Sequence, residues 1–144
     1  MPISVPLTRL ILLTSMSVSA SEQVGISVGD QEMFRYQAEP LSGPRGNAQH
    51  GADKFQASHF IHPLKTPSGF VVTEAQPADH LHHFGLWWPW KYIQDGDRKL
   101  NTWELQMGQG LVQATACEQS GNRLVAKADY MDRQAPDGPL VLLH

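Results

Sequence analysis

Histidine side chains concentrate in one part of the chain, and imidazole chemistry is the first chemistry that the sequence indicates. Five of the seven histidines fall within residues 59–83, and the densest stretch is Asp79-His80-Leu81-His82-His83. The unperturbed pKa of imidazole lies close to neutral pH, and imidazole is also the commonest metal ligand in proteins. The cluster therefore predicts an acid–base site or a metal site.

An extended backbone in this stretch would place His80 and His82 on the same face of a strand. With His59 or His62 from a neighbouring strand, these two imidazoles would complete a three-ligand set for a divalent metal. Asp79 is expected to ligate, or to accept a ring N–H and so fix the tautomer of one imidazole. The plainer alternative is that these histidines are exposed, or bonded to backbone, without any ligand.

Indole rings follow the histidines directly, in the run Phe84-Gly85-Leu86-Trp87-Trp88-Pro89-Trp90. We expect Trp87 and Trp88 to line a substrate subsite, because an indole face stacks on the apolar face of a sugar ring. Glu104, in the pair Trp103-Glu104, is a candidate acid or base near the same cleft. The alternatives are that the tryptophans belong to the core and that Glu104 is exposed on a strand.

Composition narrows the function further. Lys plus Arg is 11 and Asp plus Glu is 14, so the formal net charge of −3 argues against a nucleic-acid partner. The single cysteine, Cys117, excludes an intrachain disulfide and a multi-cysteine zinc site, and its apolar, alternating surroundings predict a small core residue. The sequence contains no phosphate-binding loop and no dinucleotide fingerprint.

Apolar residues alternate with a period of two along much of the chain, and no run shows sustained helical spacing. The pattern predicts an all-β, antiparallel β-sandwich. A strand that ends at 140–143 lacks a partner for its edge, so we expect an incomplete sandwich from a truncated chain. The expected strands cover 24–28, 33–38, 55–62, 70–73, 111–116, 124–130 and 140–143. Turns are expected at 66–69, 95–96, 120–122 and 136–138, and a loop at 40–46.

The first twenty residues have the order of a secretory signal peptide. Arg9 precedes the apolar run Leu10-Ile11-Leu12-Leu13, and Val18-Ser19-Ala20 offers small residues for cleavage. The apolar run is too short to span a bilayer. We therefore expect a signal peptide over 1–20, a domain over 21–144, a periplasmic or secreted location and no membrane span after cleavage; the alternative is a buried N-terminal strand.

Three runs of the sequence resemble the PmoA-like family, which is also catalogued as DUF6807. They are FIHPLKTPSG at 60–69, VVT at 71–73 and DHLHHFGLW at 79–87. The resemblance covers roughly residues 30–143 and corresponds to the N-terminal half of the family's members. Leu81 stands where the family usually has proline, and Phe84 where it often has arginine.

The resemblance implies a β-sandwich in exported bacterial proteins associated with sugar metabolism. It places the site at matching positions of the two motifs, namely His62, Asp79, His80, His82 and His83. The family label also implies a link to methane oxygenase.

These observations lead to a hypothesis with two alternatives. The first is an exported protein that acts on a carbohydrate or polyol through its histidines, by acid–base or divalent-metal-assisted chemistry. The alternatives are a non-catalytic carbohydrate-binding module and, from the family label, a metal-dependent oxygenase. Convergent histidines favour the first, whereas a flat tryptophan face without them favours a binding module.

We expect any metal in the protein to depend on His80 and His82. Elemental analysis of the purified protein, beside a variant in which both residues are changed to alanine, measures this dependence. The variant should lose the metal. Equal metal content in the two proteins would remove the metal hypothesis.

Overall fold

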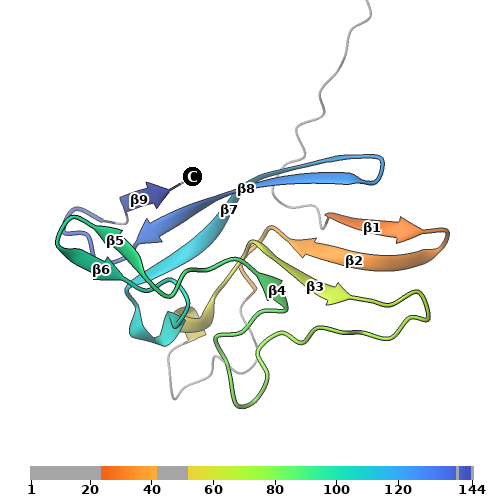
Figure 1. Ribbon diagram of the computed structural model, residues 1–144, viewed down its shortest axis with the longest axis horizontal. Helices are drawn as coiled ribbons and strands as arrows, with labels where there is room; N and C mark the ends of the chain where they lie inside the picture. Colours follow the sequence, from red (N-terminus) through yellow and green to blue (C-terminus); the bar gives the residue numbers. More distant parts are fainter. Residues whose placement is uncertain (1–23, 42–51, 139, 144) are drawn as a thin grey trace, which may run out of the picture.

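The computed structural model describes residues 24–41, 52–138 and 140–143. The expected signal peptide at 1–20 and most of the expected loop at 40–46 lie outside these residues. Within them, the strands pair antiparallel throughout and form three sheets (Figure 1). The predicted all-β antiparallel fold is confirmed. None of the helices in this part of the chain has the length and hydropathy to cross a membrane.

The first sheet has four strands in the order β1-β2-β3-β4. Its bounds are β1 Val24–Val28, β2 Gln31–Gln37, β3 Phe60–Leu64 and β4 Leu86–Trp87. The alternation predicted the first two strands well. The third begins later than predicted. A short 3-10 helix, η1 (Ala52–Phe55), ends at the buried Phe55, Ala57 forms only an isolated bridge, and the positive φ of His59 (+60°) interrupts the extended backbone before β3.

The predicted strand at 70–73 is wrong. Only an isolated bridge between Lys65 and Val71 forms there. The hydroxyl of Thr73 accepts the backbone N–H of Leu64 at 3.0 Å, so a side chain replaces the ladder partner that a full strand would supply. The apolar side chain of Val72 consequently remains half exposed.

The remaining strands form a small hairpin and a three-stranded sheet, joined through a second short 3-10 helix. Their bounds are β5 Ile93–Asp95, β6 Arg98–Leu100, η2 Leu105–Met107, β7 Gly110–Ser120, β8 Arg123–Asp132 and β9 Leu140–Leu143. The expected turns at 95–96 and 120–122 join β5 to β6 and β7 to β8. Since β9 pairs with β8, the final apolar run is part of the sheet.

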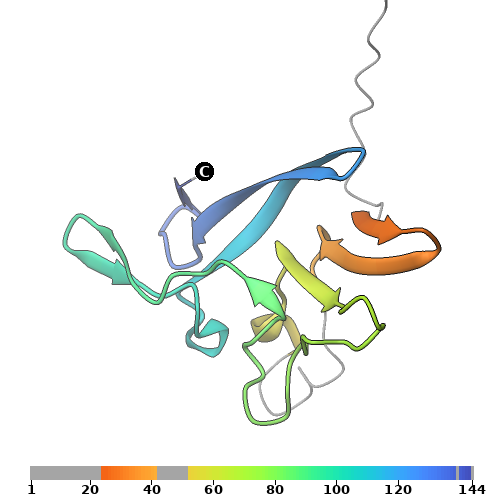
Figure 2. The same cartoon turned by 45° about the vertical axis from the view of Figure 1, so that its right-hand side comes forward.

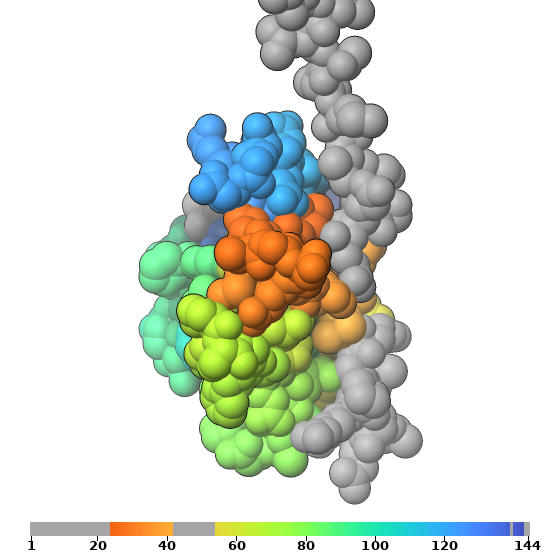
Figure 3. Space-filling model, turned by 90° about the vertical axis from the view of Figure 1, so that its right-hand side faces the viewer, coloured from red at the N-terminus to blue at the C-terminus, as the bar shows by residue number. Residues whose placement is uncertain are grey.

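The two larger sheets pack against one another, and the long β7–β8 hairpin crosses the four-stranded sheet (Figures 1 and 2). Figure 3 shows the end of this hairpin, in blue, beside the orange strands β1 and β2. Val24 and Tyr36 from the first sheet enclose Cys117 from β7. The prediction that Cys117 is a core residue is therefore confirmed.

A second core cluster lies under the histidine-rich segment. It consists of buried residues from loops, short helices and β3, joined by Leu111 from β7. Phe60 and Phe84 are fully buried and their ring centroids lie 5.1 Å apart. Burying one such phenylalanine stabilises the fold by about 1.5–3 kcal/mol. The full cluster is Phe55, Ala57, Phe60, Phe84 and Leu105.

An ion pair connects the small hairpin to the three-stranded sheet. The Arg98 guanidinium approaches the fully buried Asp132 carboxylate at 2.5 Å, and the backbone N–H of Gln134 donates to the same carboxylate at 2.8 Å. The Arg98 guanidinium holds the pKa of Asp132 below its usual range. This contact fixes β6, and with it the segment that follows, against β8.

The close approach of Gly85 to β3 is tested by a pair of alanine substitutions. Gly85 has φ +58°, and a Cβ at this position would overlap the Ile61 carbonyl oxygen. Gly96 has φ +57° with open space around it, so it is the matched control. Urea unfolding should show a loss of about 1–2 kcal/mol for Gly96→Ala, from backbone strain alone. Gly85→Ala should lose about 3–5 kcal/mol, since steric overlap adds to the strain. Equal losses in the two variants would contradict the packing described.

Candidate active site

The candidate site is built on a loop that two backbone hydrogen bonds close. The N–H of Gln76 donates to the His83 carbonyl at 2.7 Å, and the N–H of Gly85 donates to the Glu74 carbonyl at 2.9 Å. Burial of Phe84 between these contacts anchors the loop in the core. We call residues 77–83, which lie within this closure, the histidine turn.

The backbone of the histidine turn is folded, so the extended arrangement considered for His80 and His82 does not form. The N–H of His80 donates to the Pro77 carbonyl at 3.0 Å, and the N–H of His83 donates to the His80 carbonyl at 2.9 Å. Two consecutive turns result, and they bring residues three apart together. The rings of His80 and His83 stack at 4.8 Å between centroids, and His82 meets His83 edge-on at 4.5 Å.

Two indole rings lie beneath the imidazoles. The His83 ring meets Trp103 edge-on at 5.6 Å and lies 6.2 Å from Trp87. The two indoles contact one another at 5.4 Å, and Trp87 also contacts Phe84 at 5.7 Å. An aromatic path therefore runs from the core cluster to the histidine turn.

An asparagine side chain positions Trp103 and Glu104. The Asn101 side-chain oxygen accepts the backbone N–H groups of both residues, at 2.9 and 2.8 Å. Its amide nitrogen donates to the Glu104 carboxylate at 2.7 Å, and Lys91 approaches the same carboxylate at 3.5 Å. These contacts hold the pKa of Glu104 below its usual range, and its negative charge acts on His82.

Trp103 is the site residue that the sequence reasoning missed. The signal that could have found it is Asn101, because asparagine two residues before a chain reversal favours a side-chain-capped turn. Such a turn would have indicated that Trp103 lies at the same chain reversal as Glu104, which was already a candidate.

The electrostatics of the turn favour the neutral forms of His82 and His83 near pH 7. Burial lowers the pKa of His82, and the neighbouring rings lower it further, although Glu104 opposes this effect. Burial and the charge of His80 lower the pKa of His83. Asp79 approaches the Nδ1 atom of His80 at 3.0 Å. The backbone N–H of Asp79 and the His80 ring hold the pKa of this carboxyl below its usual range.

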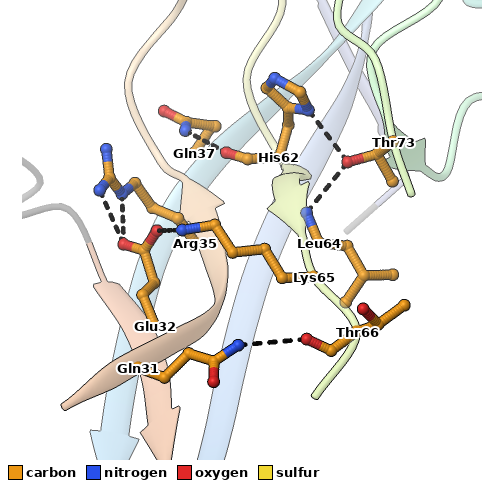
Figure 4. Close-up of polar contacts among 9 residues, drawn as sticks. All are labelled: Gln31, Glu32, Arg35, Gln37, His62, Leu64, Lys65, Thr66 and Thr73. Carbon is orange, nitrogen blue, oxygen red and sulfur yellow. Dashed lines mark hydrogen bonds and ion pairs between the residues drawn. The ribbon is translucent and has the colours of Figure 1, made fainter. Parts of the chain in front are cut away.

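His62 lies in a different setting, on β3 (Figure 4). Its Nδ1 atom lies 3.0 Å from the Thr73 hydroxyl, and its carbonyl accepts the Gln37 side-chain N–H at 2.6 Å. Burial lowers the pKa of its ring. Close by, Glu32 accepts a hydrogen bond from Arg35 within β2 and another from Lys65, the residue that follows β3 (Figure 4). The contact with Lys65 ties β2 to the end of β3.

The structure therefore brings together most, but not all, of the predicted site. Asp79, His80, His82, His83, Trp87 and Glu104 gather around the histidine turn. Within the described residues, neither His59 nor His62 makes a ring contact with the three imidazoles. Trp88 contacts His59 instead, at 5.1 Å. Trp87 and Trp88 thus contact different histidines, and their role in a substrate subsite stays a prediction.

The donor set does not form a three-ligand metal centre. In the part of the chain that the structure describes, no group of three or more His, Cys, Asp or Glu side chains is placed to hold a metal ion. The ring centroids of His80 and His82 lie 6.0 Å apart. The assignment of these two residues to a metal stays a prediction, and the chemistry derived below uses the imidazoles alone.

Comparison with known protein families identifies a match over most of the chain. A family described as "Family of unknown function (DUF6807)" matches residues 23–142. No curated protein and no solved structure matches the chain.

Histidine titrations test the electrostatics of the turn. We expect the ring pKa values of His82 and His83, measured by NMR, to lie below the usual 6.5. His80→Gln should raise both values, because it removes a positive charge that opposes protonation of the neighbouring rings. His62→Gln is the control and should leave both unchanged. Values that do not respond to His80→Gln would show that the three rings are not gathered as described.

Proposed function

The chain belongs to the family of unknown function DUF6807, and we propose that it binds a carbohydrate or related polyol at the histidine turn and acts on it by acid–base chemistry. The observation that carries this proposal is the gathering of three imidazoles, 4.5 to 6.0 Å apart between ring centroids, above a pair of indoles. Polar proton-transfer groups beside an aromatic wall match a ligand with many hydroxyls and one apolar face.

In this proposal His80 is the oriented base. Asp79 accepts the Nδ1–H of His80, which leaves Nε2 with a free lone pair that can take a proton from a substrate hydroxyl. The arrangement is that of a carboxylate fixing the tautomer of a general base. His82 and His83 are neutral near pH 7, so either can accept a proton or relay one to a leaving oxygen.

Binding in the proposal comes from the indoles and from Glu104. Trp87 and Trp103 provide the surface on which the apolar face of a sugar ring stacks, and their amphipathic rings lose little conformational entropy on binding. The Glu104 carboxylate accepts hydroxyl hydrogen bonds beside His82. The expected signal peptide at 1–20 would place this activity in the periplasm or outside the cell.

A non-catalytic carbohydrate-binding module is the second candidate, and an exposed aromatic ridge favours it. Trp88, Trp90 and Tyr92 are 44%, 58% and 59% exposed. The backbone of Trp88 and Trp90 is held in place, because the Tyr130 hydroxyl donates to the Trp88 carbonyl at 2.6 Å and Thr102 bonds both the N–H and the carbonyl of Trp90. A fixed row of exposed rings can bind a glycan without turnover.

Turnover assays with paired variants distinguish the two candidates. The protein is incubated with a panel of neutral oligosaccharides and polyols, and products are measured by mass spectrometry. We expect turnover that falls by at least about 100-fold in His80→Gln and His83→Gln, which is the usual contribution of a general acid or base. In the intact protein the rate should fall as the pH drops below the lowered pKa values of His82 and His83, because only neutral imidazole accepts a proton.

Trp90→Ala is the matched control for the ridge. It removes an exposed ring outside the histidine turn, so turnover of a small substrate should be unchanged. Binding without product, abolished by Trp90→Ala and unaffected by His83→Gln, would support the binding module and reject acid–base catalysis. A rate that is insensitive to both histidine variants would also reject it.

A further inference from the structure

A hollow lies beside His59, whose ring contacts Trp88. It has a volume of about 570 Å³ and is formed by β7, β8 and the residue that precedes β3. This volume falls in the range of about 300–1,000 Å³ that is usual for small-ligand sites. Two alanines give it an apolar floor, and His59, Thr115, Lys127 and Asp129 give it polar walls.

The backbone of His59 is held in a conformation that side-chain-bearing residues rarely adopt. Its φ is +60°, and histidine in this region is uncommon and costs conformational energy. The N–H of His59 donates to the Gln37 carbonyl at 2.8 Å, and its ring contacts Trp88 at 5.1 Å. Such strain persists where surrounding contacts hold it, and it concentrates at binding sites.

A buried tyrosine fixes the tautomer of His59. The Tyr36 hydroxyl lies 2.8 Å from the Nδ1 atom of His59, and the tyrosine is 1% exposed. Burial raises the pKa of Tyr36, so its hydroxyl stays protonated and needs an acceptor. If the phenol donates to Nδ1, the His59 ring proton sits on Nε2. The ring edge away from Tyr36 then offers a hydrogen-bond donor to a ligand.

The opposite wall contains a β-bulge. The register between β7 and β8 shifts between Ala114 and Ala116, which leaves Thr115 as the extra residue. Bulges re-aim side chains next to functional sites, and here Thr115 lines the hollow. Three independent features, namely the volume, the strained histidine and the bulge, therefore meet at one place.

We propose that this hollow is a second ligand site, independent of the histidine turn, for a small neutral compound with several hydroxyl groups. Lys127 and Asp129 carry opposite charges, so the walls select neither an anion nor a cation. The Nε2–H of His59 and the hydroxyl of Thr115 provide hydrogen bonds for ligand hydroxyls, and Trp88 beside His59 provides an aromatic rim.

NMR titration of the isotope-labelled protein with glucose, galactose and myo-inositol tests this proposal. We expect at least one compound to give saturable amide shifts at His59, Thr115 and Lys127. Thr115→Tyr fills the hollow from an exposed position and should weaken this binding by at least about tenfold. Ala116→Tyr, at the exposed neighbouring position outside the hollow, is the matched control and should keep the affinity within about twofold.

A second variant keeps the test decisive if Thr115→Tyr fails to fold. His59→Asn removes the imidazole but keeps a residue that tolerates positive φ, and it should also weaken binding. Absence of saturable shifts at the hollow with all three compounds, or wild-type affinity in Thr115→Tyr, would overturn the proposal. Shifts confined to the histidine turn would overturn it while leaving the acid–base proposal intact, and the converse pattern would support this site alone.

Discussion

The backbone of Gly85 lies so close to the Ile61 carbonyl on β3 that no side chain fits between them. This approach, together with full burial of Phe84 one residue earlier, fixes where the chain leaves the core and enters the first sheet. The histidine turn is closed by hydrogen bonds on either side of the same point, so its rings are positioned by the core rather than by their own contacts. Residues that are half exposed, and would otherwise sample many rotamers, thereby acquire a defined mutual geometry.

Two adjacent tryptophans contact different polar sites of the molecule. Trp87 packs toward His83 and Trp103, whereas Trp88 packs on His59 beside a separate hollow. The last residue of β4 and the residue after it thus provide aromatic contacts to two polar sites of different character. The histidine turn is open and rich in proton-transfer groups, while the hollow combines a strained histidine with a mixed-charge wall. This contrast is consistent with the proposal that the histidine turn carries the reaction and the hollow binds a ligand.

Local alternation was sufficient to predict the long strands, because β1, β2, β7 and β8 each show the period of two over several residues. The two- and three-residue strands β4, β5 and β6 are too short to display a period, and only the turn at 95–96 marked one of their connections. The residue types and their spacing predicted most of the candidate site, because residues that are close in sequence within a turn are also close in space. They could not reveal that His62 bonds Thr73, because that pairing depends on the path of the chain between them. Asn101 marks the turn that carries Trp103, but the place of Trp103 beside His83 depends on tertiary packing and could not be predicted from that signal.

The contact between the His83 ring and the Trp103 indole connects the core to the proposed chemistry, and proton–proton NOEs between these rings measure it directly. The two rings meet edge-on at 5.6 Å between centroids, which places their protons within NOE range. The account predicts clear cross-peaks between the His83 ring protons and the Trp103 indole protons in the native protein. A well-folded protein whose His83 ring shows no NOE to either Trp103 or Trp87 would contradict it.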